Sequence, residues 1–571
     1  MAPGGKKPVN VFKLHNLGVP SNVFNWRLWF AVFSFGLLGA ARGVDEGLIS
    51  GAFNSKDFQS TIHYSQYDDV TKANIKANVS AMVQIGSVAG ALFSFLICDR
   101  IGRIWAVRQL CVLWIIGIAI FMGANGNLGA IYAGRFIAGL GVGQTPVVGP
   151  VYIAEIAPAP IRGLCTCIFT GFVYLGIVLA YFTNYGCQVH LGDTSHARWL
   201  VPTSLHIMFA GIIFLLTFLQ YESPRYLIKN GQHEKAVETM ARLRHLPADD
   251  PYVTHEIAAI HMSHQEELEA TKGAGAWGIL KEAFTVPSNL YRIYLTIFAQ
   301  VMSQWSGAGS ITVYAPDLFS LLGIKGTETS LLVTGVFGIV KLIAAVICAL
   351  FLVDVIGRKR SLLAGITLQA ISMIYIAGFL TAVPQLGVQK GYQLDASEKG
   401  PSRGAIFMIY LSGAGWALGW NSMQYLLTAE LFPLRIRALS TSLAMCFHFA
   451  NQYGNTRAVP NMLLPASDGG LSPKGTFWCF AAVTILGGFW VWFFVPETAG
   501  RSLESMDRLF ALPWYRIGRH GNEDAELQDE VYESKVRQAE QTEFAHLEKN
   551  NEAVAPAAAP RTIEEVGETR A

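Results

Sequence analysis

The sequence predicts an all-α membrane protein in which twelve transmembrane helices form two parallel six-helix halves. Two observations carry this prediction: apolar runs of about twenty residues recur along the chain, and short charged motifs of the first half return in the same order in the second. The composition agrees, because 52% of the 571 residues are hydrophobic and 15% are charged, whereas about 25% are charged in soluble proteins. A net charge of +2 argues against a nucleic-acid partner.

Each predicted span is a predominantly apolar run that is long enough to cross the hydrocarbon layer as one helix. The first span also serves as the insertion signal, because residues 1–25 are polar and lack the apolar core of a removable signal peptide. The twelve spans are predicted at 26–46, 78–98, 105–123, 128–153, 164–184, 200–219, 291–315, 330–353, 361–383, 404–427, 438–459 and 475–495.

Polar segments divide the chain into five regions. Residues 234–246 and 255–271 have helical spacing and many charges, which predicts surface helices. The end of the chain is charged and then rich in Ala and Pro, which predicts a largely disordered tail whose Lys535 and Lys549 are candidate ubiquitin acceptors for endocytosis. The regions are an N-terminal segment (1–25), a first six-helix half (26–219), a central loop (220–290), a second half (291–495) and a tail (496–571).

Basic residues are concentrated in the turns that lie on the same side as the N-terminus. Lys and Arg near span ends favour the cytoplasmic side, so both termini and the central loop are predicted to be cytoplasmic, in the plasma membrane. The residues that indicate this side are Lys6, Lys7, Lys13, Arg27, Arg100, Arg103, Arg108, Arg162, Arg358, Lys359, Arg360, Arg435 and Arg437.

The charged motifs of the first half have counterparts in the second. Residues 99–103 read DRIGR and residues 354–358 read DVIGR. Two parallel six-helix repeats are typical of a large class of transporters, in which the substrate lies between the halves near the membrane midplane. The other counterparts are Glu155 and Arg162 with Glu430 and Arg437, at the same internal spacing, and more loosely Glu222 with Glu497.

Three ionisable residues, Arg42, Asp45 and Glu46, interrupt the apolar sequence of the first span. A charge at the centre of a bilayer costs roughly 2.5–3.5 kcal/mol. Either the first helix ends near Ala41 and the charges lie among lipid headgroups, or they form a buried site on a longer helix. Arg135, a lone cation in the fourth span, needs an anionic partner, which favours the buried site with Asp45 as that partner.

The chain resembles the sugar porters of the major facilitator superfamily over about residues 30–500. The resemblance implies the major facilitator fold and a transporter whose partners are a sugar or sugar acid, protons and the lipid bilayer. The residues themselves show no nucleophile–base set, metal site or phosphate loop, so no enzymatic activity, cofactor or metal is expected. The motifs that carry it are GVDEGLISG (43–51), DRIGR (99–103), GRF (134–136), Glu155 with Arg162 and Gly163, ESPRYL (222–227), YAP (314–316), DVIGR (354–358), ELFPLRIR (430–437) and PET (496–498).

In proton-coupled members of this family, the acid that matches Asp45 carries the proton. The arginine that matches Arg135 pairs with this acid and separates from it when it is protonated. The chemistry is sound, because a nearby cation favours the charged carboxylate whereas desolvation favours the protonated form. The resemblance therefore implies proton symport, with facilitated transport as the alternative.

The matched acids and bases at the cytoplasmic helix ends predict a gate of ion pairs that breaks when the two halves rock apart. An exposed pair contributes about 0–1 kcal/mol, which suits a gate that opens repeatedly. Ordinary positively charged turns are the alternative, but they leave the acids unexplained. The predicted gate residues are Asp99, Arg100, Arg103, Glu155, Arg162, Glu222, Arg225, Asp354, Arg358, Glu430, Arg437 and Glu497.

The positions that line the substrate site in the family differ in this chain. Sugar porters use amide side chains, which both donate to and accept from sugar hydroxyl groups. Here several of these amides are replaced, and two potential cations, Arg42 and His448, appear. The predicted substrate-binding residues are Arg42, Thr170, Gln304, Trp305, Trp420, Tyr425 and His448.

Because Arg binds carboxylates with paired hydrogen bonds, we expect a sugar acid or polyol acid as substrate, such as a hexuronate (galacturonate) or quinate. In the alternative, Arg42 pairs with Glu46, His448 is a core histidine, and the substrate is a neutral hexose or pentose. A third possibility is a nutrient sensor on the same scaffold that does not transport. Lys341, another cation in the eighth span, has no assigned role.

Overall fold

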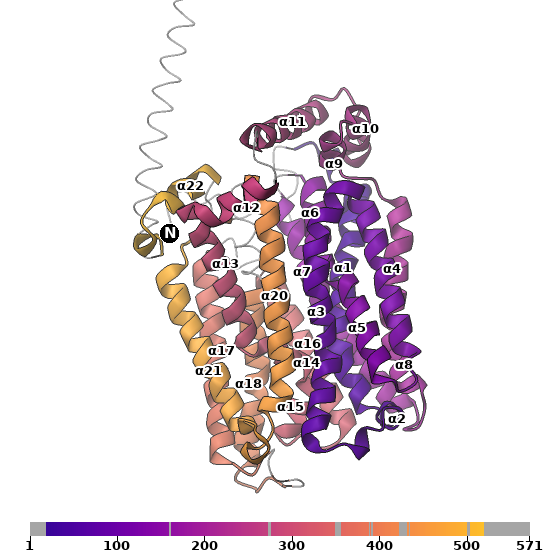
Figure 1. Ribbon diagram of the computed structural model, residues 1–571, viewed down its shortest axis with the longest axis vertical. Coiled ribbons are helices and arrows are strands. Elements are labelled where there is room, and N and C mark those ends of the chain that lie inside the picture. Colours follow the sequence, from indigo (N-terminus) through magenta and orange to yellow (C-terminus); the bar gives the residue numbers. More distant parts are fainter. Residues whose placement is uncertain are drawn as a thin grey trace, which may run out of the picture.

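The computed structural model describes residues 19–158, 161–271, 276–348, 356–386, 389, 392–421, 431–432, 434–498 and 503–518. Helices dominate this part of the chain, and no strand occurs among these residues. The long helices run alongside one another as a single bundle, with short helices over its ends (Figure 1). The predicted all-α architecture is confirmed.

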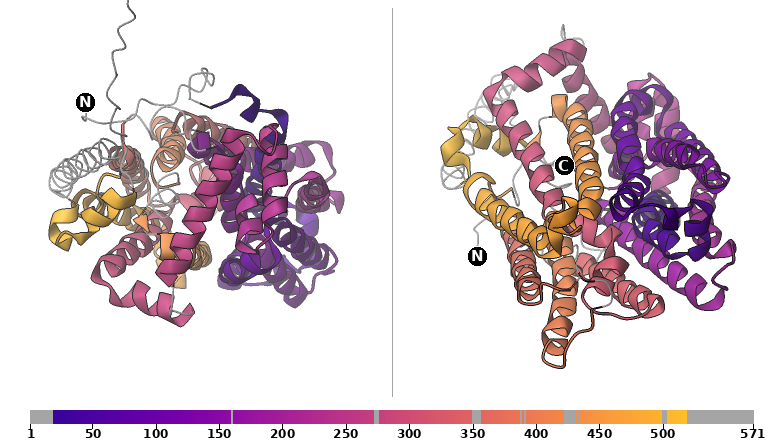
Figure 2. Two further views of the ribbon diagram at one scale, coloured as in Figure 1. Left: turned by 90° about the horizontal axis from the view of Figure 1, so that it is seen from above. Right: turned by 60° about the horizontal axis from the view of Figure 1, so that its bottom comes forward.

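The first half contributes the helices on one side of the bundle (Figures 1 and 2). They are α1 (Trp26–Asn54), α2 (Lys56–Thr61), α3 (Asp69–Ile101), α4 (Arg103–Met122), α5 (Leu128–Val142), α6 (Thr145–Ile156), α7 (Arg162–His190) and α8 (Ala197–Leu216). The second half contributes α13 (Pro287–Trp305), α14 (Ala308–Val313), α15 (Ala315–Leu321), α16 (Thr327–Ile347), α17 (Arg358–Ala382), α18 (Lys399–Leu418), α20 (Leu434–Met462) and α21 (Ser472–Phe494).

Short helices cover one end of the bundle. Between the halves lie α9 (Pro224–Lys229), α10 (His233–Arg244), α11 (Pro251–Thr271) and α12 (Ala276–Thr285), and after α21 come α22 (Leu503–Ala511) and α23 (Trp514–Ile517). We call the end that carries α9–α11 the upper end and the end that carries α2 the lower end, as in Figure 1. Of the predicted tail, residues 496–498 and 503–518 are described, and most of the second stretch is helical. Lys535 and Lys549 lie outside the described residues.

By length and composition, nine helical stretches within the described residues can cross a membrane. Each of them overlaps one of the twelve predicted spans. The other three spans, predicted at 291–315, 404–427 and 438–459, fall on α13–α15, α18 and α20. The first of these is broken at Gly307, where φ is 86°, so no single helix covers it. The third, α20, contains several amide and basic side chains, which lower its mean hydropathy.

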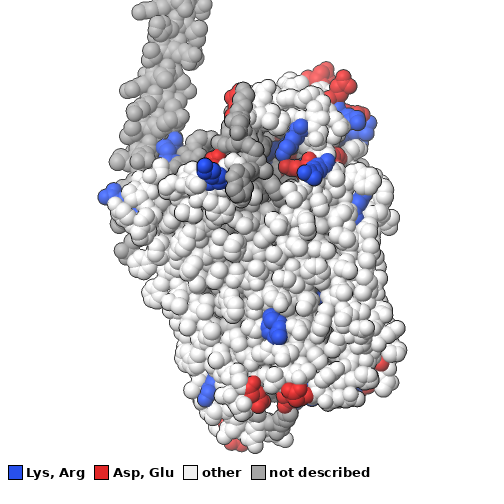
Figure 3. All heavy atoms as spheres, in the orientation of Figure 1, with Lys and Arg blue, Asp and Glu red and all other residues white. Residues whose placement is uncertain are grey.

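The molecular surface fits a protein that spans a bilayer. On the face drawn in Figure 3, charged side chains gather over the two ends, and the broad band between them is almost free of charge. Large apolar side chains such as Leu215, Phe407 and Phe489 are exposed. A soluble protein rarely exposes so much contiguous apolar surface, so this band is the surface that faces lipid.

The first helix is longer than the sequence predicted. Asn25 caps its start by accepting hydrogen bonds from the N–H groups of Arg27 and Leu28, and α1 then continues to Asn54. The alternative in which the first helix ends near Ala41 is therefore wrong. At about 1.5 Å per residue, Asp45 lies about 28 Å along α1 from Trp26.

Small residues bring the helices of the first half into close contact. A Cβ at Gly43 of α1 would overlap the carbonyl oxygen of Val173 on α7. Similarly, a Cβ at Gly139 of α5 would overlap the carbonyl oxygen of Val83 on α3. Such close approach of backbones is typical of membrane helices, which gain little from hydrophobic association in lipid. It places α1 and α5 close enough to the neighbouring helices for their charged residues to meet.

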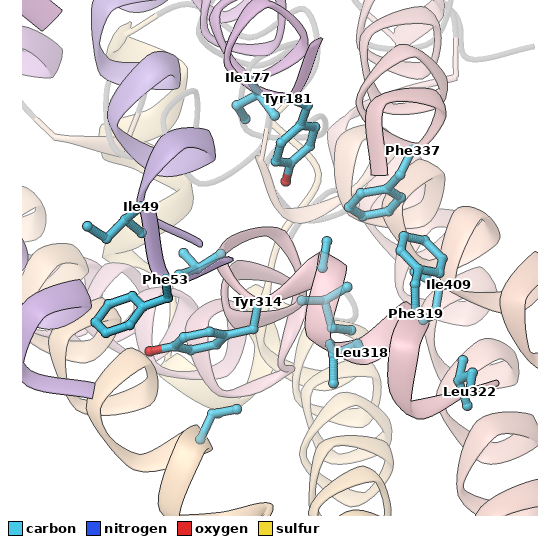
Figure 4. Close-up of a cluster of buried hydrophobic side chains, with 14 of the residues drawn as sticks. Ile49, Phe53, Ile177, Tyr181, Tyr314, Leu318, Phe319, Leu322, Phe337 and Ile409 are labelled. Atoms are coloured by element: carbon cyan, nitrogen blue, oxygen red, sulfur yellow. The ribbon is translucent and has the colours of Figure 1, made fainter. Parts of the chain in front are cut away.

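The two halves are joined at the lower end. A hydrophobic cluster contains Phe53 of α1 and Tyr181 of α7 together with Tyr314, which lies between α14 and α15, and Phe337 of α16 (Figure 4). Tyr181 Oη donates to the carbonyl oxygen of Thr312, at 2.6 Å. These contacts pack apolar and hydroxyl groups of both halves against each other.

Polar contacts add to this junction. Lys76 Nζ of α3 lies 2.8 Å from Asp317 Oδ2 of α15. Arg457 Nη2 and Asn461 Nδ2 of α20 donate to Asn74 Oδ1, at 2.9 and 3.1 Å. The lower end is therefore closed by direct contacts between the halves.

Candidate functional site

A buried cluster of three ionisable side chains lies inside the first half. Asp45 Oδ1 of α1 is 2.7 Å from Arg135 Nη1 of α5 and 3.3 Å from His206 Nε2 of α8. All three side chains are at most 3% exposed. Arg135 Nε also donates to the carbonyl oxygen of Val79, at 3.2 Å. The guanidinium is thus held by one carboxylate and one backbone carbonyl, as a buried cation requires.

His206 was missed by the sequence analysis. The available signal was the same as for Arg135, namely a titratable residue inside an apolar span. Its Nδ1 lies 3.0 Å from the carbonyl oxygen of Thr203 on the same helix. This contact orients the ring so that Nε2 faces Asp45.

A second polar cluster lies between the two halves. Arg42 Nη2 of α1 is 3.1 Å from His448 Nε2 of α20, and 3.4 Å from Glu46 Oε1 one turn further along α1. The guanidinium carbon also lies 5.2 Å from the centre of the Phe449 ring. Since a guanidinium has no acceptor, His448 Nε2 accepts here, so the ring is neutral and its proton is on Nδ1. In this arrangement Arg42 is a cation and His448 is not.

Amide side chains surround His448. His448 Nδ1 donates to Gln300 Oε1 of α13, at 3.0 Å, and Gln304 of the same helix lies 3.3 Å from the same nitrogen. Gln452 Nε2 donates to Glu46 Oε1 at 3.5 Å, which is a long contact across the halves. Gln300 and Gln452 were not predicted. They restore part of the amide lining whose loss the sequence suggested.

The other predicted substrate residues are spread more widely. Trp305 is half-buried and its Nε1 donates to Asn451 Oδ1, at 3.2 Å. Trp420 is 1% exposed and belongs to the apolar core of the second half. Thr170 lies half-buried on α7, and Tyr425 lies outside the described residues.

Lys341 is fully enclosed on α16 and does not reach either end of the bundle. Its Nζ donates to Thr312 Oγ1 of α14, at 2.6 Å. The ammonium also lies 5.3 Å from the ring centre of Tyr174 and 5.4 Å from that of Phe337. A hydroxyl partner and two aromatic faces stabilise this cation.

At the upper end, the predicted gate residues of the first half are linked to one another. Arg103 Nη2 contacts Glu155 Oε1 at 2.9 Å and Asp99 Oδ1 at 3.3 Å. Lys229 of α9 contacts Asp99 Oδ2 at 2.7 Å. These three ion pairs join residues of the first half and the central loop, and none of the three reaches the second half. Arg100, Arg162 and Arg225 are exposed at this end.

Glu222 and Glu497 are the acids that connect this network to helix starts. Glu222 accepts from the backbone N–H groups of Arg103 and Ile104, at 3.0 and 3.2 Å. Burial raises the pKa of Glu222 above its usual value, and the backbone hydrogen bonds oppose this effect. Glu497 makes the corresponding contacts with Arg358 and Lys359. Asp354, Glu430 and the side chain of Arg437 lie outside the described residues.

The fold and these buried charges define a multi-pass membrane transporter of the major facilitator superfamily. The chain matches the family described as sugar (and other) transporter over residues 31–510, and it belongs to that family.

Relatives and solved structures agree with this assignment. The chain is 32% identical to the quinate permease of Emericella nidulans over 493 residues, which cover 86% of this chain and 90% of the relative. It is 30% identical to the quinate permease of Neurospora africana over 496 residues, with shares of 86% and 90%. The proton:xylose symporter XylE bound to 6-bromo-6-deoxy-D-glucose has a similar fold, with a TM-score of 0.70, 22% identity and coverage of 85% of this chain and 99% of the symporter.

Proposed function

We propose that this protein takes up a carboxylate-bearing polyol or sugar acid, with quinate as the leading candidate, by proton-coupled alternating access. The observation that carries the proposal is the contact between Arg42 and His448. It places a guanidinium between the two halves, about 24 Å along α1 from Trp26. An anionic substrate is the natural partner of a cation in that position.

The contacts of Arg42 suit exchange of one carboxylate for another. Its distance of 3.4 Å to Glu46 exceeds the 2.7–2.9 Å that is typical of charge-assisted hydrogen bonds. A substrate carboxylate can therefore take the place of Glu46 at modest cost. His448 is held by Gln300 and keeps the Arg42 guanidinium directed toward the second half. The side-chain amides of Gln300 and Gln304 are suited to bind the hydroxyl groups of the substrate.

The names of the relatives support an acidic substrate. Two permeases that share about 30% identity with nearly the whole chain are named for quinate, which is a hydroxylated carboxylate. The sequence pattern around Arg42 and the relatives thus point to the same substrate class.

Asp45 and Arg135 provide the coupling to protons. When Asp45 is charged, it is paired with Arg135. Protonation removes the carboxylate charge and weakens this pair, which frees α5 to move relative to α1. One proton and one carboxylate substrate together carry no net charge, so the pH gradient drives this uptake. A membrane potential adds about 2.3 kcal/mol per 100 mV only for each further charge that is moved.

The upper end is the cytoplasmic end in this proposal, and the membrane is the plasma membrane. Arg100, Arg162 and Arg225 are exposed there, as basic residues on the cytoplasmic side tend to be. The lower end would then face outside, and its closure by Lys76 and Asp317 corresponds to a state closed to the exterior. In the opposite state, which is closed to the cytoplasm, the upper-end charges act as the gate that must open to release substrate.

Uptake by purified protein in liposomes tests the proposal. With an acidic exterior, labelled quinate should accumulate inside, unlabelled galacturonate should compete, and glucose should not. Arg42→Gln should lower quinate uptake at least about tenfold, since this removes a charge-assisted contact. Arg27→Gln, at the upper start of the same helix, should leave the preference for acids over neutral sugars unchanged. Competition by neutral hexoses but not by acids would overturn the substrate assignment, and no accumulation of any substrate would favour a sensor.

The contact between Arg42 and Glu46 also supports a second candidate, a symporter or facilitator of neutral hexoses or pentoses. In that case Glu46 neutralises Arg42 permanently, and the surrounding amides bind only hydroxyl groups. Glu46→Gln separates the two candidates. It should strengthen binding of an acid by removing a competing carboxylate, whereas it should weaken a site that needs Glu46 for a neutral sugar.

A further inference from the structure

His206 has no assigned role, yet its ring is directed at the carboxylate of Asp45. The side chain is 3% exposed, and its Nε2 has no partner that meets hydrogen-bond geometry, although it lies 3.3 Å from Asp45 Oδ1. Trp114 of α4 packs beside the ring, with ring centres 6.3 Å apart. No water-filled path is needed for the two groups to exchange a proton.

The other ring nitrogen determines what Nε2 can do. Nδ1 lies 3.0 Å from the carbonyl oxygen of Thr203, and a carbonyl oxygen only accepts. Nδ1 therefore carries a hydrogen, and in the neutral ring Nε2 carries only a lone pair. An ionised carboxylate is also an acceptor only. Two facing acceptors at 3.3 Å lack a proton, and one added proton could be shared between them as a hydrogen bond once the ring or the carboxylate turns into line.

We propose that Asp45 and His206 hold the transported proton as a pair, so that His206 is a second proton-coupling residue. This inference rests on the proposed proton symport. On loading, one proton adds to the Asp45 carboxylate and is shared with the lone pair of His206 Nε2, and the net charge of the pair rises from −1 to 0. On release, the same proton leaves to water, and Arg135 pairs again with the carboxylate.

The groups around the pair have opposite effects on proton binding. Arg135 of α5 favours the ionised carboxylate of Asp45. The lone pair on Nε2 of His206, on α8, favours the protonated form. Val79 of α3 contributes a carbonyl that holds Arg135, and Trp114 of α4 contributes no charge. Glu46, next to Asp45 on α1, is engaged by Arg42 and Gln452. Arg135 and His206 therefore set the pH at which the site takes up its proton.

Infrared difference spectroscopy of the reconstituted full chain tests this without any transport measurement. The carboxylic acid band that Asp45→Asn removes is followed as the pH is lowered. In His206→Leu and His206→Phe the pH of half-protonation should fall by about one unit, as expected for loss of one hydrogen bond to the protonated form. Trp114→Phe, which alters packing beside the ring, should leave the midpoint unchanged.

An unchanged midpoint in either His206 variant would overturn the proposal, and His206→Leu serves if His206→Phe does not fold. In liposomes, His206→Leu should also move the pH optimum of gradient-driven quinate uptake to lower pH while exchange of internal for external quinate continues. If quinate is not a substrate, the infrared titration still decides the role of His206. The two proposals can therefore fail separately.

Discussion

Glu222 and Glu497 make the same two contacts in the two halves of the molecule. Each carboxylate accepts hydrogen bonds from two successive backbone N–H groups at the start of a helix, α4 in the first half and α17 in the second. The preceding glycine has a positive φ in both turns, 90° at Gly102 and 97° at Gly357. The loose sequence similarity around these acids therefore corresponds to one capping arrangement that occurs twice.

Removing either capping acid should destabilise the protein. Glu222→Ala and Glu497→Ala each leave two N–H groups of a helix start without their carboxylate and remove a negative charge from the positive end of the helix. We expect a loss of about 1 to 2 kcal/mol, measured as a lower melting temperature in detergent. Glu234→Ala, in the exposed first turn of α10, is the matched control. Equal melting temperatures for all three variants would contradict the capping role.

Asp45→Asn should uncouple transport from protons. The amide cannot take up a proton, yet it still fits beside Arg135, so the halves can exchange positions. Accumulation of labelled quinate in liposomes should fall to equilibrium with the exterior, while exchange across the membrane continues. Continued accumulation against a gradient would exclude Asp45 as the proton carrier.

The contact between α1 and α7 should tolerate no side chain at Gly43. A Cβ there would overlap the backbone of Val173, whereas nothing lies within 4 Å of a Cβ at Gly171 on α7. Gly43→Ala should therefore reduce the yield of folded protein severalfold, because overpacking a core costs about 1–3 kcal/mol. Gly171→Ala should not. The yield is read from size-exclusion chromatography in detergent, and similar profiles for both variants would show that the helices can separate.

An ion-pair cluster at the lower end should make stability depend on pH. A hydrogen bond from Lys56 and contacts with Arg198 lower the pKa of Asp193 to about 2, from an ordinary value of 3.8. Because the folded state binds this proton less tightly than the unfolded state, the stabilisation is present above about pH 4 and is lost as the pH falls toward about 2.

Melting curves of the wild type and Asp193→Asn measure this dependence. The variant should melt at a lower temperature at pH 6, and the difference should shrink as the pH is lowered below about 4. Asp468→Asn, in another lower-end loop, is a suitable comparison. A difference that stays constant down to pH 3 would show that Asp193 acts through packing and not through its charge.

Much of the architecture was predictable because it depends on local composition. The apolar runs, the charged turns and their repetition identified the spans, since a helix in lipid must satisfy its backbone internally and avoid charge. Asp45 and Arg135 were predicted as partners for the same reason. They contact each other at 2.7 Å between α1 and α5, and this gives the buried cation the anionic partner that it requires.

Other features depend on how helices pack. The end of α1 was misplaced because the charges at 42–46 resemble a helix end until α5, α8 and α20 surround them. The sequence suggested two cations in Arg42 and His448, but the ring of His448 accepts a hydrogen bond from Arg42 and is neutral in this structure. Gln300 was not predicted because only its contact with His448 in the folded protein indicates that it lines the site.

The sequence alone thus determined the class of protein and the order of the apolar spans that the structure supports, and it proposed a candidate proton carrier. These follow from hydropathy, charge and repetition along one chain. Only the tertiary structure decided that His206 faces Asp45, that Arg42 meets His448 between the halves, and that the lower end is closed. Each of these three relationships joins residues that lie far apart in the sequence. The pairing and protonation of the side chains depend on distances that are set only when the helices pack together.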